Sequence, residues 1–560
     1  MDSHVFKRTE FFLIALLTFF SFLIPFTLRA IDDNRLTSWL WAFSSVNITW
    51  FSLIIISGII LAYILTRVSF PKLNPSVFLF LLSFISVMPF WKLPEVIVDA
   101  SRYFTQAKHL EVYGIEYFLR EWGRDINIWT DMPIIPFLYG LIFKFFGESR
   151  VYIQAFTTLL FSMTVVLTYK IGKTLWNETV GIYAGVLLLG IPYLFSQIPL
   201  MLVDVPAMFF LTLSIFAFIM ALERGGAWIP FSSAALFMAF FSKYSTWLML
   251  SVLFVIFIVY SIQHSSELEG NYIYRASIIA SITGLLIGIF FLYKFEVFSE
   301  QIRLLIAYQK PGLKRWEESF ISTFFFQMHP FIAASAIYSA YAAFKRRDIK
   351  YAIISYLIIL IILLQIKRIR YIIMVFPMLT LMASYGLQEI RDKDVRRFIA
   401  SCIVICSLAI GMFAYLPFLQ KTSAMNLKYA GEFLDSIDRE NIEVFTIPQR
   451  ENLVNHAVSV PIIDLFTKKK IIYYYDTGFL PPPEDLERSP LRFTWEYRNP
   501  EYYTAKNKDS KRALLVITDD LEQRLPAHIE QKIEGYGKSK VFKTWEGVFS
   551  YKTSVAVYYN

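Results

Sequence analysis

Asp99 is the residue of this chain whose type and position best suit acid–base chemistry. It ends the segment Pro94-Glu-Val-Ile-Val-Asp99, just after an apolar run. If a helix covers 99–110, Tyr103 and Ala107 follow at i+4 and i+8 and share a face with Asp99. A carboxylate held beside apolar residues at a membrane surface suits a general base. The alternative is an N-cap, in which the Asp99 side chain binds the free N–H groups of the first helical turn.

Asp204 is a second candidate carboxylate. It heads an apolar run, where a negative charge interacts favourably with a helix dipole, and this electrostatic role is the alternative to a catalytic one. In the catalytic interpretation Asp204 faces Asp99 across a pocket and orients the acceptor. The two carboxylates could also flank a divalent cation, although the sequence contains no clear cluster of metal ligands. Cys402 and Cys406 lie in one apolar run and make no metal motif.

Basic residues between apolar segments predict an anion site. Lys367, Arg368 and Arg370 lie between two apolar runs and suit an anionic lipid head group, with generic lipid contact as the alternative. Lys243 separates two apolar halves and is either a phosphate ligand or a lysine that snorkels to the interface. Further pocket candidates are Arg102, Tyr103, His329 and Tyr371.

The composition indicates a membrane protein. Of the 560 residues, 56% are hydrophobic and 18% are charged, whereas soluble chains average about 45–50% and about 25%. The apolar residues form long runs, which excludes a soluble enzyme and a disordered chain. The net charge of +9 comes from residues before 420, because 420–560 is neutral. This distribution favours loop orientation and anionic lipid groups, rather than nucleic acid, as the cause of the basic excess.

The apolar runs predict thirteen spanning helices, since a span needs about 20 apolar residues. They are 11–29, 49–66, 75–91, 151–169, 179–197, 205–222, 227–241, 244–262, 276–293, 322–344, 350–366, 371–388 and 398–418.

Lys and Arg in the short loops predict a cytoplasmic N-terminus. Two long segments, 92–150 and 420–560, then lie outside the cell, in an integral plasma membrane protein. Lys367, Arg368 and Arg370 also fall outside, against the charge rule, which argues for a function. Within 92–150, the apolar stretch Pro133–Phe146 is too short to span and predicts an interfacial helix.

Residues 420–560 predict a soluble α/β domain, and we expect a transmembrane catalytic domain over 1–419. The predicted strands are Ile442–Ile447, Lys470–Tyr475, Ala513–Thr518 and Ser554–Tyr559, the predicted helices are Tyr429–Ile437 and Asp520–Glu534, and Pro481–Pro483 predicts a rigid loop.

Several motifs in the order of the chain resemble the GT-C membrane glycosyltransferases. The pattern Asp99-x3-Tyr103-x3-Ala107-x6-Gly114 is similar to the first outer loop of glycosyltransferase family 39 and its relatives, which include protein O-mannosyltransferases and the aminoarabinose transferase of lipid A. Pro133–Gly147 resembles the proline-started amphipathic helix of that family, which ends in Phe-Gly. Looser matches are Asp204-Val-Pro206, Ser242-Lys243-Tyr244, and Arg370-Tyr371 followed by Pro377.

Three positions depart from the family pattern. Ala100 stands where an acidic residue often follows the Asp, and Asp131 lies two residues before Pro133, where a His or Lys is frequent. Arg150 is close to the position of a common Arg, whereas Gln154 is nearer the usual spacing. These departures leave the acceptor type and the phosphate ligands open.

The resemblance implies a GT-C fold and inverting transfer of a sugar from a dolichyl or undecaprenyl phosphate. It implies Asp99 and Asp204 as catalytic residues, and it supports Lys243, Lys367, Arg368 and Arg370 as ligands of the donor phosphate. We expect no required cofactor, with a divalent cation as an option. The expected partners are the donor, membrane lipids and a protein, lipid or glycan acceptor, but no nucleic acid. Because nucleotide sugars are cytosolic, an active site outside needs a lipid-linked donor that has already crossed the membrane.

Two other classes fit part of the sequence. A flippase or transporter of lipid-linked sugars would also have many spans and outward cations, but the ionisable residues cluster at one face rather than at the midplane. A structural or sensor protein would leave the ordered motifs unexplained.

Overall fold

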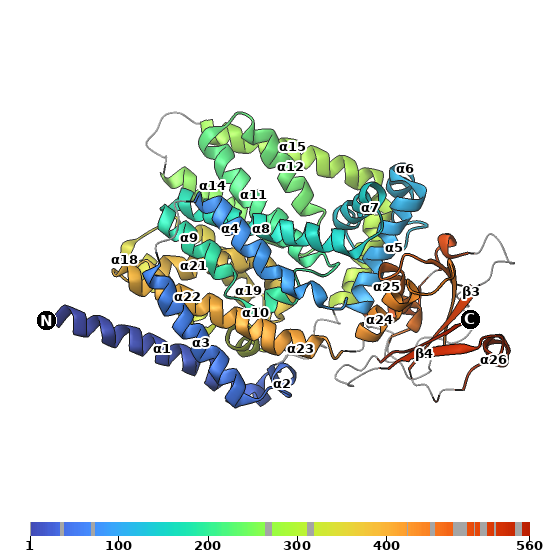
Figure 1. Ribbon diagram of the computed structural model, residues 1–560. Helices are drawn as coiled ribbons and strands as arrows, with labels where there is room; N and C mark the ends of the chain where they lie inside the picture. The colour runs from blue at the N-terminus through green and yellow to red at the C-terminus, as the bar shows by residue number, and fades with distance from the viewer. Residues whose placement is uncertain are drawn as a thin grey trace.

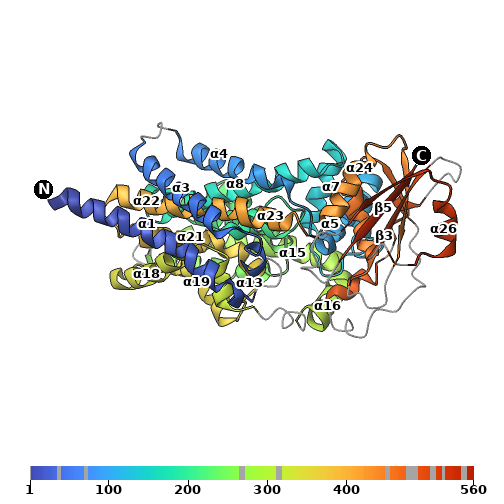
Figure 2. The same cartoon turned by 60° about the horizontal axis from the view of Figure 1, so that its bottom comes forward.

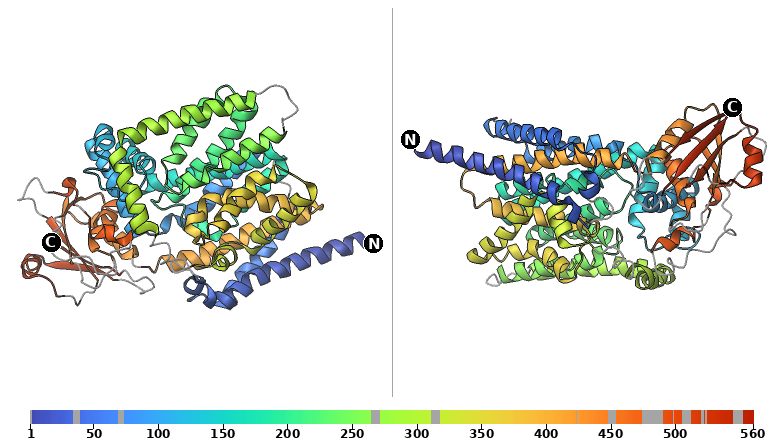
Figure 3. Two further views of the ribbon diagram at one scale, coloured as in Figure 1. Left: turned by 180° about the vertical axis from the view of Figure 1, so that it is seen from behind. Right: turned by 90° about the horizontal axis from the view of Figure 1, so that it is seen from below.

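The computed structural model describes residues 2–33, 39–68, 73–263, 271–310, 318–422, 424–447, 454–473, 490–497, 499–504, 512–519, 522, 524–543 and 552–560. A helical bundle is followed by a smaller unit built on a sheet (Figure 1). The N-terminus and the sheet lie at opposite ends of the molecule, as Figures 2 and 3 show from other sides.

Within these described residues, nine helices are long and apolar enough to cross a membrane, and each coincides with a predicted span. The nine are built on α1 (Asp2–Leu28), α3 (Ile48–Arg67), α4 (Pro75–Val87), α8 (Arg150–Leu175), α11 (Asp204–Arg224), α14 (Val252–Gln263), α15 (Asn271–Tyr293), α21 (Phe376–Leu387) and α22 (Lys393–Ile410). Three of them include adjoining α-helical turns: α13 (Thr246–Met249) precedes α14, α20 (Ile369–Ile372) precedes α21, and α23 (Leu416–Leu419) follows α22 at the end of the bundle. A separate short helix, α2 (Trp39–Ala42), lies between α1 and α3 in the chain.

The other four predicted spans form shorter helices, α9 (Glu178–Leu188), α12 (Trp228–Phe240), α18 (Pro330–Arg346) and α19 (Tyr351–Leu363). The predicted span 179–197 is wrong in length, because the helix stops before Gly190 and Pro192, and α10 (Pro192–Phe195) follows as a separate turn. A proline lacks the N–H that would continue the helical ladder. Pro330 likewise separates α18 from the π-helical turn Ser322–Phe326.

Three helices outside the spans connect α4 to α8 and lie between the bundle and the sheet unit, namely α5 (Ile97–Tyr113), α6 (Ile115–Glu121) and α7 (Ile134–Phe146). The predicted short helix after Pro133 is present, with 13 residues and one buried face.

Small residues explain much of the motif that starts at Asp99. A Cβ atom at Gly140 of α7 would lie 2.7 Å from the Cβ atom of Leu110 and 3.0 Å from the carbonyl oxygen of Ala107. The two helices can therefore approach this closely because residue 140 has no side chain. Gly114 ends α5 at φ +92°, a conformation that L-residues with a side chain rarely adopt.

The C-terminal unit is a five-stranded mixed sheet with the order β2-β1-β3-β5-β4. Its strands are β1 (Asn441–Thr446), β2 (Lys470–Tyr473), β3 (Arg512–Thr518), β4 (Lys538–Phe542) and β5 (Ser554–Tyr559), and its helices are α24 (Ala424–Leu434), α25 (Val460–Leu465) and α26 (Ala527–Ile533). The first three strands in this order are parallel, and β5 runs antiparallel to both β3 and β4. Helices α24 and α25 face the bundle, while α26 lies beyond the sheet (Figure 2).

The predicted α/β fold of this unit is confirmed, with local differences. Strand β4 is missing from the prediction, because its lysine-rich, exposed sequence lacks the apolar alternation of a half-buried strand. The helix predicted over 520–534 is shorter and covers only α26. Tyr474, Tyr475 and Pro481–Pro483 lie outside the described residues.

A buried ion pair holds the outer loop against the bundle. Arg150 Nε lies 2.7 Å from Glu95 Oε1, and its other nitrogens donate to the carbonyl oxygens of Trp91 and Leu93. The second Glu95 oxygen accepts a hydrogen bond of 2.9 Å from the backbone N–H of Met201. Because Met201 is three residues before Asp204, this pair places the start of α11 relative to α5.

We expect Arg150→Ala to lower the free energy of unfolding by about 3–5 kcal/mol, because it leaves the Glu95 carboxylate buried without a counter-charge. The thermal midpoint of the detergent-purified protein measures the loss. Arg303→Ala is the matched control, since its pair with Glu300 is 73% and 49% exposed and should contribute about 1 kcal/mol at most. Equal shifts in the two variants would contradict the assignment.

Candidate active site

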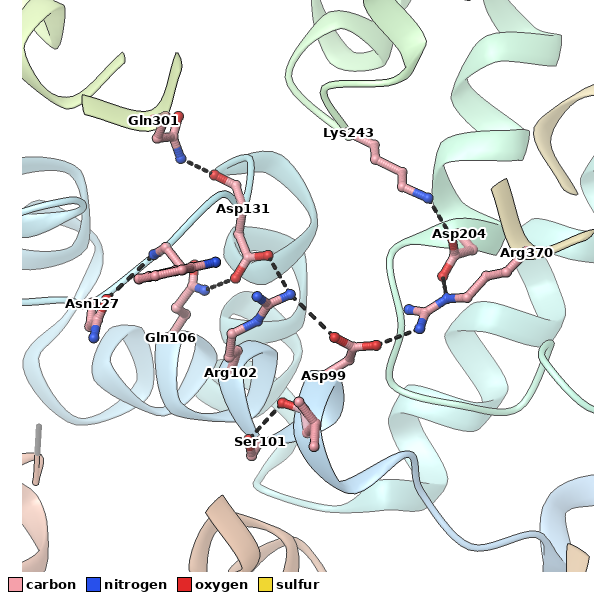
Figure 4. Close-up of polar contacts among 12 residues, drawn as sticks. Asp99, Ser101, Arg102, Gln106, Asn127, Asp131, Asp204, Lys243, Gln301 and Arg370 are labelled. Atoms are coloured by element: carbon pink, nitrogen blue, oxygen red, sulfur yellow. Dashed lines mark hydrogen bonds and ion pairs between the residues drawn. The ribbon is translucent and has the colours of Figure 1, made fainter. Parts of the chain in front are cut away.

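Arg370 joins two carboxylates that are far apart in the sequence. Its Nε lies 3.0 Å from Asp204 Oδ2, and its Nη1 contacts Asp99 Oδ2 (Figure 4). Arg370 comes from α20, Asp204 from the first turn of α11, and Asp99 from the first turn of α5. Lys243 Nζ, from the turn between α12 and α13, lies 2.6 Å from the other Asp204 oxygen.

A second cation extends this network into the outer loop. Arg102 Nη2 lies 3.3 Å from Asp99 Oδ1 and 3.0 Å from Asp131 Oδ1. Gln106 donates to the other oxygen of Asp131 at 2.9 Å, and Gln301 donates to the Asp131 backbone carbonyl at 2.5 Å. Three carboxylates and three cations therefore alternate in one chain of contacts, which we call the acid–base network: Lys243, Asp204, Arg370, Asp99, Arg102 and Asp131.

Asp99 is the accessible carboxylate of the acid–base network. Its side chain is 21% exposed, compared with 4% for Asp131 and 1% for Asp204. The N-cap interpretation of Asp99 is wrong, because α5 begins at Ile97 with Val96 as its N-cap. Asp99 is thus the most exposed of the three carboxylates.

The environment keeps Asp99 ionised. Burial alone would raise its pKa, but the guanidinium groups of Arg370 and Arg102 outweigh burial and hold the pKa well below its usual range. A carboxylate with so low a pKa is a weak base while both guanidinium groups remain in place. Any change that removes one of them makes Asp99 a stronger base.

Asp131 has the opposite character. Burial raises its pKa to about 6, and the negative charge of Asp99 adds to this rise, while Arg102 opposes it. In the sequence, Asp131 is recognisable only as a departure from the family pattern, and it is not among the predicted site residues. Its one signal was an acidic residue two positions before Pro133.

Arg368 and Tyr371 lie beside the network. Arg368 is over the Tyr371 ring at 5.1 Å and donates to its hydroxyl at 3.2 Å, and Lys243 lies 5.6 Å from the same ring. Glu318 is 3.9 Å from Arg368. Burial raises the pKa of Glu318 to about 7, although Arg368 opposes the rise.

The structure brings most of the predicted site residues together and leaves two apart. Tyr103 is buried one turn after Asp99, with the Arg102 guanidinium 5.6 Å from its ring. The Lys367 side chain is exposed, and its backbone carbonyl accepts a hydrogen bond from Thr323. His329 is buried next to Phe22 and Cys406, and its Nδ1 caps α18 by accepting from the N–H of Phe331.

The position of Asp204 also changes its predicted role. Both of its oxygens hold cations and its side chain is buried, so it does not face an acceptor. It instead fixes Lys243 and Arg370. The Arg370 guanidinium lies between Asp99 and Asp204, where a divalent cation shared by the two carboxylates would have to sit. Within the described part of the chain, no three side chains from His, Cys, Asp and Glu converge as metal ligands.

Comparisons with known proteins agree with this architecture. Residues 131–287 match the family described as dolichyl-phosphate-mannose-protein mannosyltransferase. The apo crystal structure of ArnT from Cupriavidus metallidurans is 9% identical, with a TM-score of 0.53, over 86% of this chain and 97% of ArnT. The structure of the same ArnT bound to undecaprenyl phosphate gives 10% identity, a TM-score of 0.50, and coverage of 91% and 98%. No curated protein matches the chain in sequence.

The chain is thus an integral membrane protein with the fold of the GT-C glycosyltransferases. The resemblance to the mannosyltransferase and ArnT group that the motifs predict is confirmed, as is the polytopic helical fold with a C-terminal α/β unit.

We expect Asp131→Asn to flatten the dependence of stability on pH between about 4 and 6. The folded protein takes up a proton on Asp131 near pH 6, whereas an unfolded Asp has a pKa of 3.8. Stability from this group is therefore full below pH 4 and is lost as the pH rises through 6, by about 3 kcal/mol. Thermal midpoints in detergent across this range measure the effect.

Asp125→Asn is the control for this measurement, since Asp125 is exposed in the same loop. A wild-type protein and an Asp131→Asn variant with parallel pH profiles would contradict the buried, proton-binding character of Asp131.

Proposed function

We propose that this protein is an inverting glycosyltransferase that moves a sugar from a polyprenyl phosphate to a hydroxyl or amine acceptor outside the cytoplasm. The observation that carries the proposal is the position of Arg370. Its guanidinium pairs both with the accessible carboxylate of Asp99 and with the buried carboxylate of Asp204. The ArnT structure that holds undecaprenyl phosphate supports the donor class.

The charges of the acid–base network define how a phosphate binds. Its three carboxylates balance its three cations, so a phosphate gains a cation only by displacing a carboxylate. Asp99 is the most exposed of the three carboxylates, so a phosphate displaces it from its cation most easily. The donor phosphate therefore takes Arg370 from Asp99, while Lys243 and Arg368 approach it from the side of Tyr371.

Donor binding in this way makes Asp99 a stronger base. With Arg370 engaged by the phosphate, the pKa of Asp99 rises, and its freed oxygen accepts the proton of the acceptor hydroxyl or amine. The acceptor oxygen or nitrogen bonds to the anomeric carbon as the bond from that carbon to the phosphate oxygen breaks. The polyprenyl phosphate leaves with one more negative charge, which Arg370, Arg368 and Lys243 stabilise. These cations take the part that a divalent metal ion plays in other phosphoryl sites.

The orientation of the charged loops supports an active site outside the cytoplasm. Helix α5, which carries Asp99 and Arg102 of the acid–base network, lies at the end of the bundle next to the C-terminal unit, opposite the N-terminus (Figure 1). With the N-terminus in the cytoplasm, as the basic short loops predict, the network and residues 420–560 face outward.

Asp99→Asn is expected to abolish transfer and to leave donor binding equal or tighter. The amide cannot take a proton, and it no longer competes with the phosphate for Arg370. Binding of radiolabelled polyprenyl phosphate sugars to the detergent-purified protein gives the affinity, and transfer to host membrane extract gives the activity. Glu116→Gln is the control, because Glu116 is 93% exposed in the adjoining helix α6.

Turnover retained by Asp99→Asn would remove Asp99 as the base. Donor binding that weakens in this variant would contradict the competition for Arg370. If the wild-type protein binds none of the donors, the proposed class itself is wrong.

Arg370→Lys should reduce kcat by about 10²–10³, although it keeps the charge. An ammonium is a point charge, so it cannot hold Asp204 and a phosphate at once in the fixed geometry of a guanidinium. Steady-state kinetics with a fixed acceptor tests this. Arg346→Lys is the matched control, because Arg346 pairs with Glu389 at the opposite end of the bundle. An Arg370→Lys variant with nearly wild-type kcat would show that the fork geometry is not needed.

A further inference from the structure

A cavity of about 210 Å³ opens beside the acid–base network, between the outer loop and the C-terminal unit. The outer loop lines it with residues of α5, α6 and the turn that follows. The C-terminal unit lines it with residues between 493 and 501. Neither unit forms this cavity alone, so the C-terminal unit completes a site that adjoins Asp99.

Arg102 connects the wall of the cavity to the acid–base network. Arg102 lines the cavity and at the same time contacts Asp99 and Asp131. Phe493 of the C-terminal unit covers the same guanidinium, with its ring centroid 4.6 Å away. A molecule held in the cavity thus ends next to the accessible carboxylate that the proposed mechanism uses as its base.

Aromatic rings and planar polar groups share the walls. The Tyr113 and Tyr117 rings are tilted by 39° with their centroids 4.7 Å apart, and Phe493 and Tyr497 of the other unit line the same cavity. The amides of Asn127 and Asn499 lie among these rings. A pyranose ring has the matching chemistry, since its C–H face packs on aromatic rings while its rim of hydroxyls binds planar amides and carboxylates.

The cavity carries a net negative charge, and this charge limits the class of ligand that can bind there. Asp125 and Glu501 line it, whereas the Arg102 charge is offset by its two carboxylate partners. His109 adds no positive charge. Burial lowers its pKa although the Thr105 carbonyl and Asp125 oppose this. Its Nδ1 lies 2.7 Å from that carbonyl and must therefore donate to it. A phosphorylated or carboxylated ligand would be repelled.

The size of the cavity favours a single ring. Sites for drug-sized ligands usually measure about 300–1,000 Å³, and this cavity is smaller. An extended peptide would need a longer groove with backbone partners along it. We propose that this cavity binds the acceptor, and that the acceptor is a neutral sugar residue of a glycan or glycolipid. The inference rests on the proposed function for its role in transfer, but the binding of a neutral sugar is independent of it.

Direct binding separates this inference from the proposed function. The protein used is the full-length Asp99→Asn variant in detergent, which cannot turn over. The probes are mannotriose, maltotriose and N-acetylchitotriose, a 6-phosphate derivative of each, and a peptide that contains Ser and Thr. We expect at least one neutral trisaccharide to bind at least tenfold more tightly than its phosphate and than the peptide. Preference for a phosphorylated probe or the peptide, or no binding of any neutral probe, would overturn the proposal.

Variants locate the binding in this cavity. Tyr117→Ala should raise the acceptor KM at least tenfold with donor affinity and kcat within twofold of the wild type, because the aromatic platform contacts only the acceptor. Glu501→Gln should reduce the preference for the neutral probe over its phosphate at least threefold. Tyr429→Ala is the matched control, since Tyr429 is 43% exposed on α24 of the same unit. Neutral sugars that bind Tyr117→Ala as tightly as the wild type would place the acceptor elsewhere.

Discussion

The attraction between Arg370 and two carboxylates is the interaction on which the rest of the structure depends. A guanidinium buried at the end of a helical bundle costs several kcal/mol unless anionic partners surround it. Asp204 and Asp99 supply these partners from segments 166 and 271 residues away. Because each ion is costly alone, the positions of α5, α11 and α20 are coupled, and the outer loop cannot be placed independently of the last third of the bundle.

Two kinds of contact hold the scaffold around this interaction together. Close approach of helices is one, as at Gly140, where α7 crosses α5 against Leu110 and Ala107. Buried charge pairs are the other. Glu95 and Arg150 fix the turn before α11, and Lys108 of α5 pairs with Glu148 at 3.0 Å and with Asp464 of α25 at 2.5 Å. The ion pair between Lys108 and Asp464 also attaches the C-terminal unit to α5, the helix that carries Asp99. This attachment explains how residues of the C-terminal unit come to line a cavity beside the network.

The balance of charge in the network has a chemical consequence. Three acids and three bases in alternation leave no surplus charge at rest, so the site is stable without a ligand and yet responds to one. An entering phosphate must take a cation from a carboxylate, and Asp99 is the exposed carboxylate. Its low pKa at rest and its release on donor binding would tie the base to the presence of the sugar. Such a site would protect the donor from reaction before it is fully bound.

The sequence by itself determined the membrane class, the positions of the spans, the α/β character of residues 420–560 and the identity of most ionisable residues in the network. These follow from local patterns: long apolar runs, period-two strands, and carboxylates or cations at the ends of apolar segments. The ends of helices at Gly190 and Pro330 are harder to predict from the sequence, because an apolar run continues through each position. The exposed strand β4 lacks the apolar alternation that marks a half-buried strand.

Only the tertiary structure decided which charges meet. Asp131 belongs to the network because the loop before α7 brings it against Arg102 and Gln106 of α5. Asp204 pairs with two cations because Lys243 and Arg370 converge on it. Lys367 and His329 have the residue types of the site, but the Lys367 side chain is exposed and His329 caps α18. Pairing between charges from distant segments depends on how helices cross, and helix crossing depends on shape and packing, which no local pattern of residue types records.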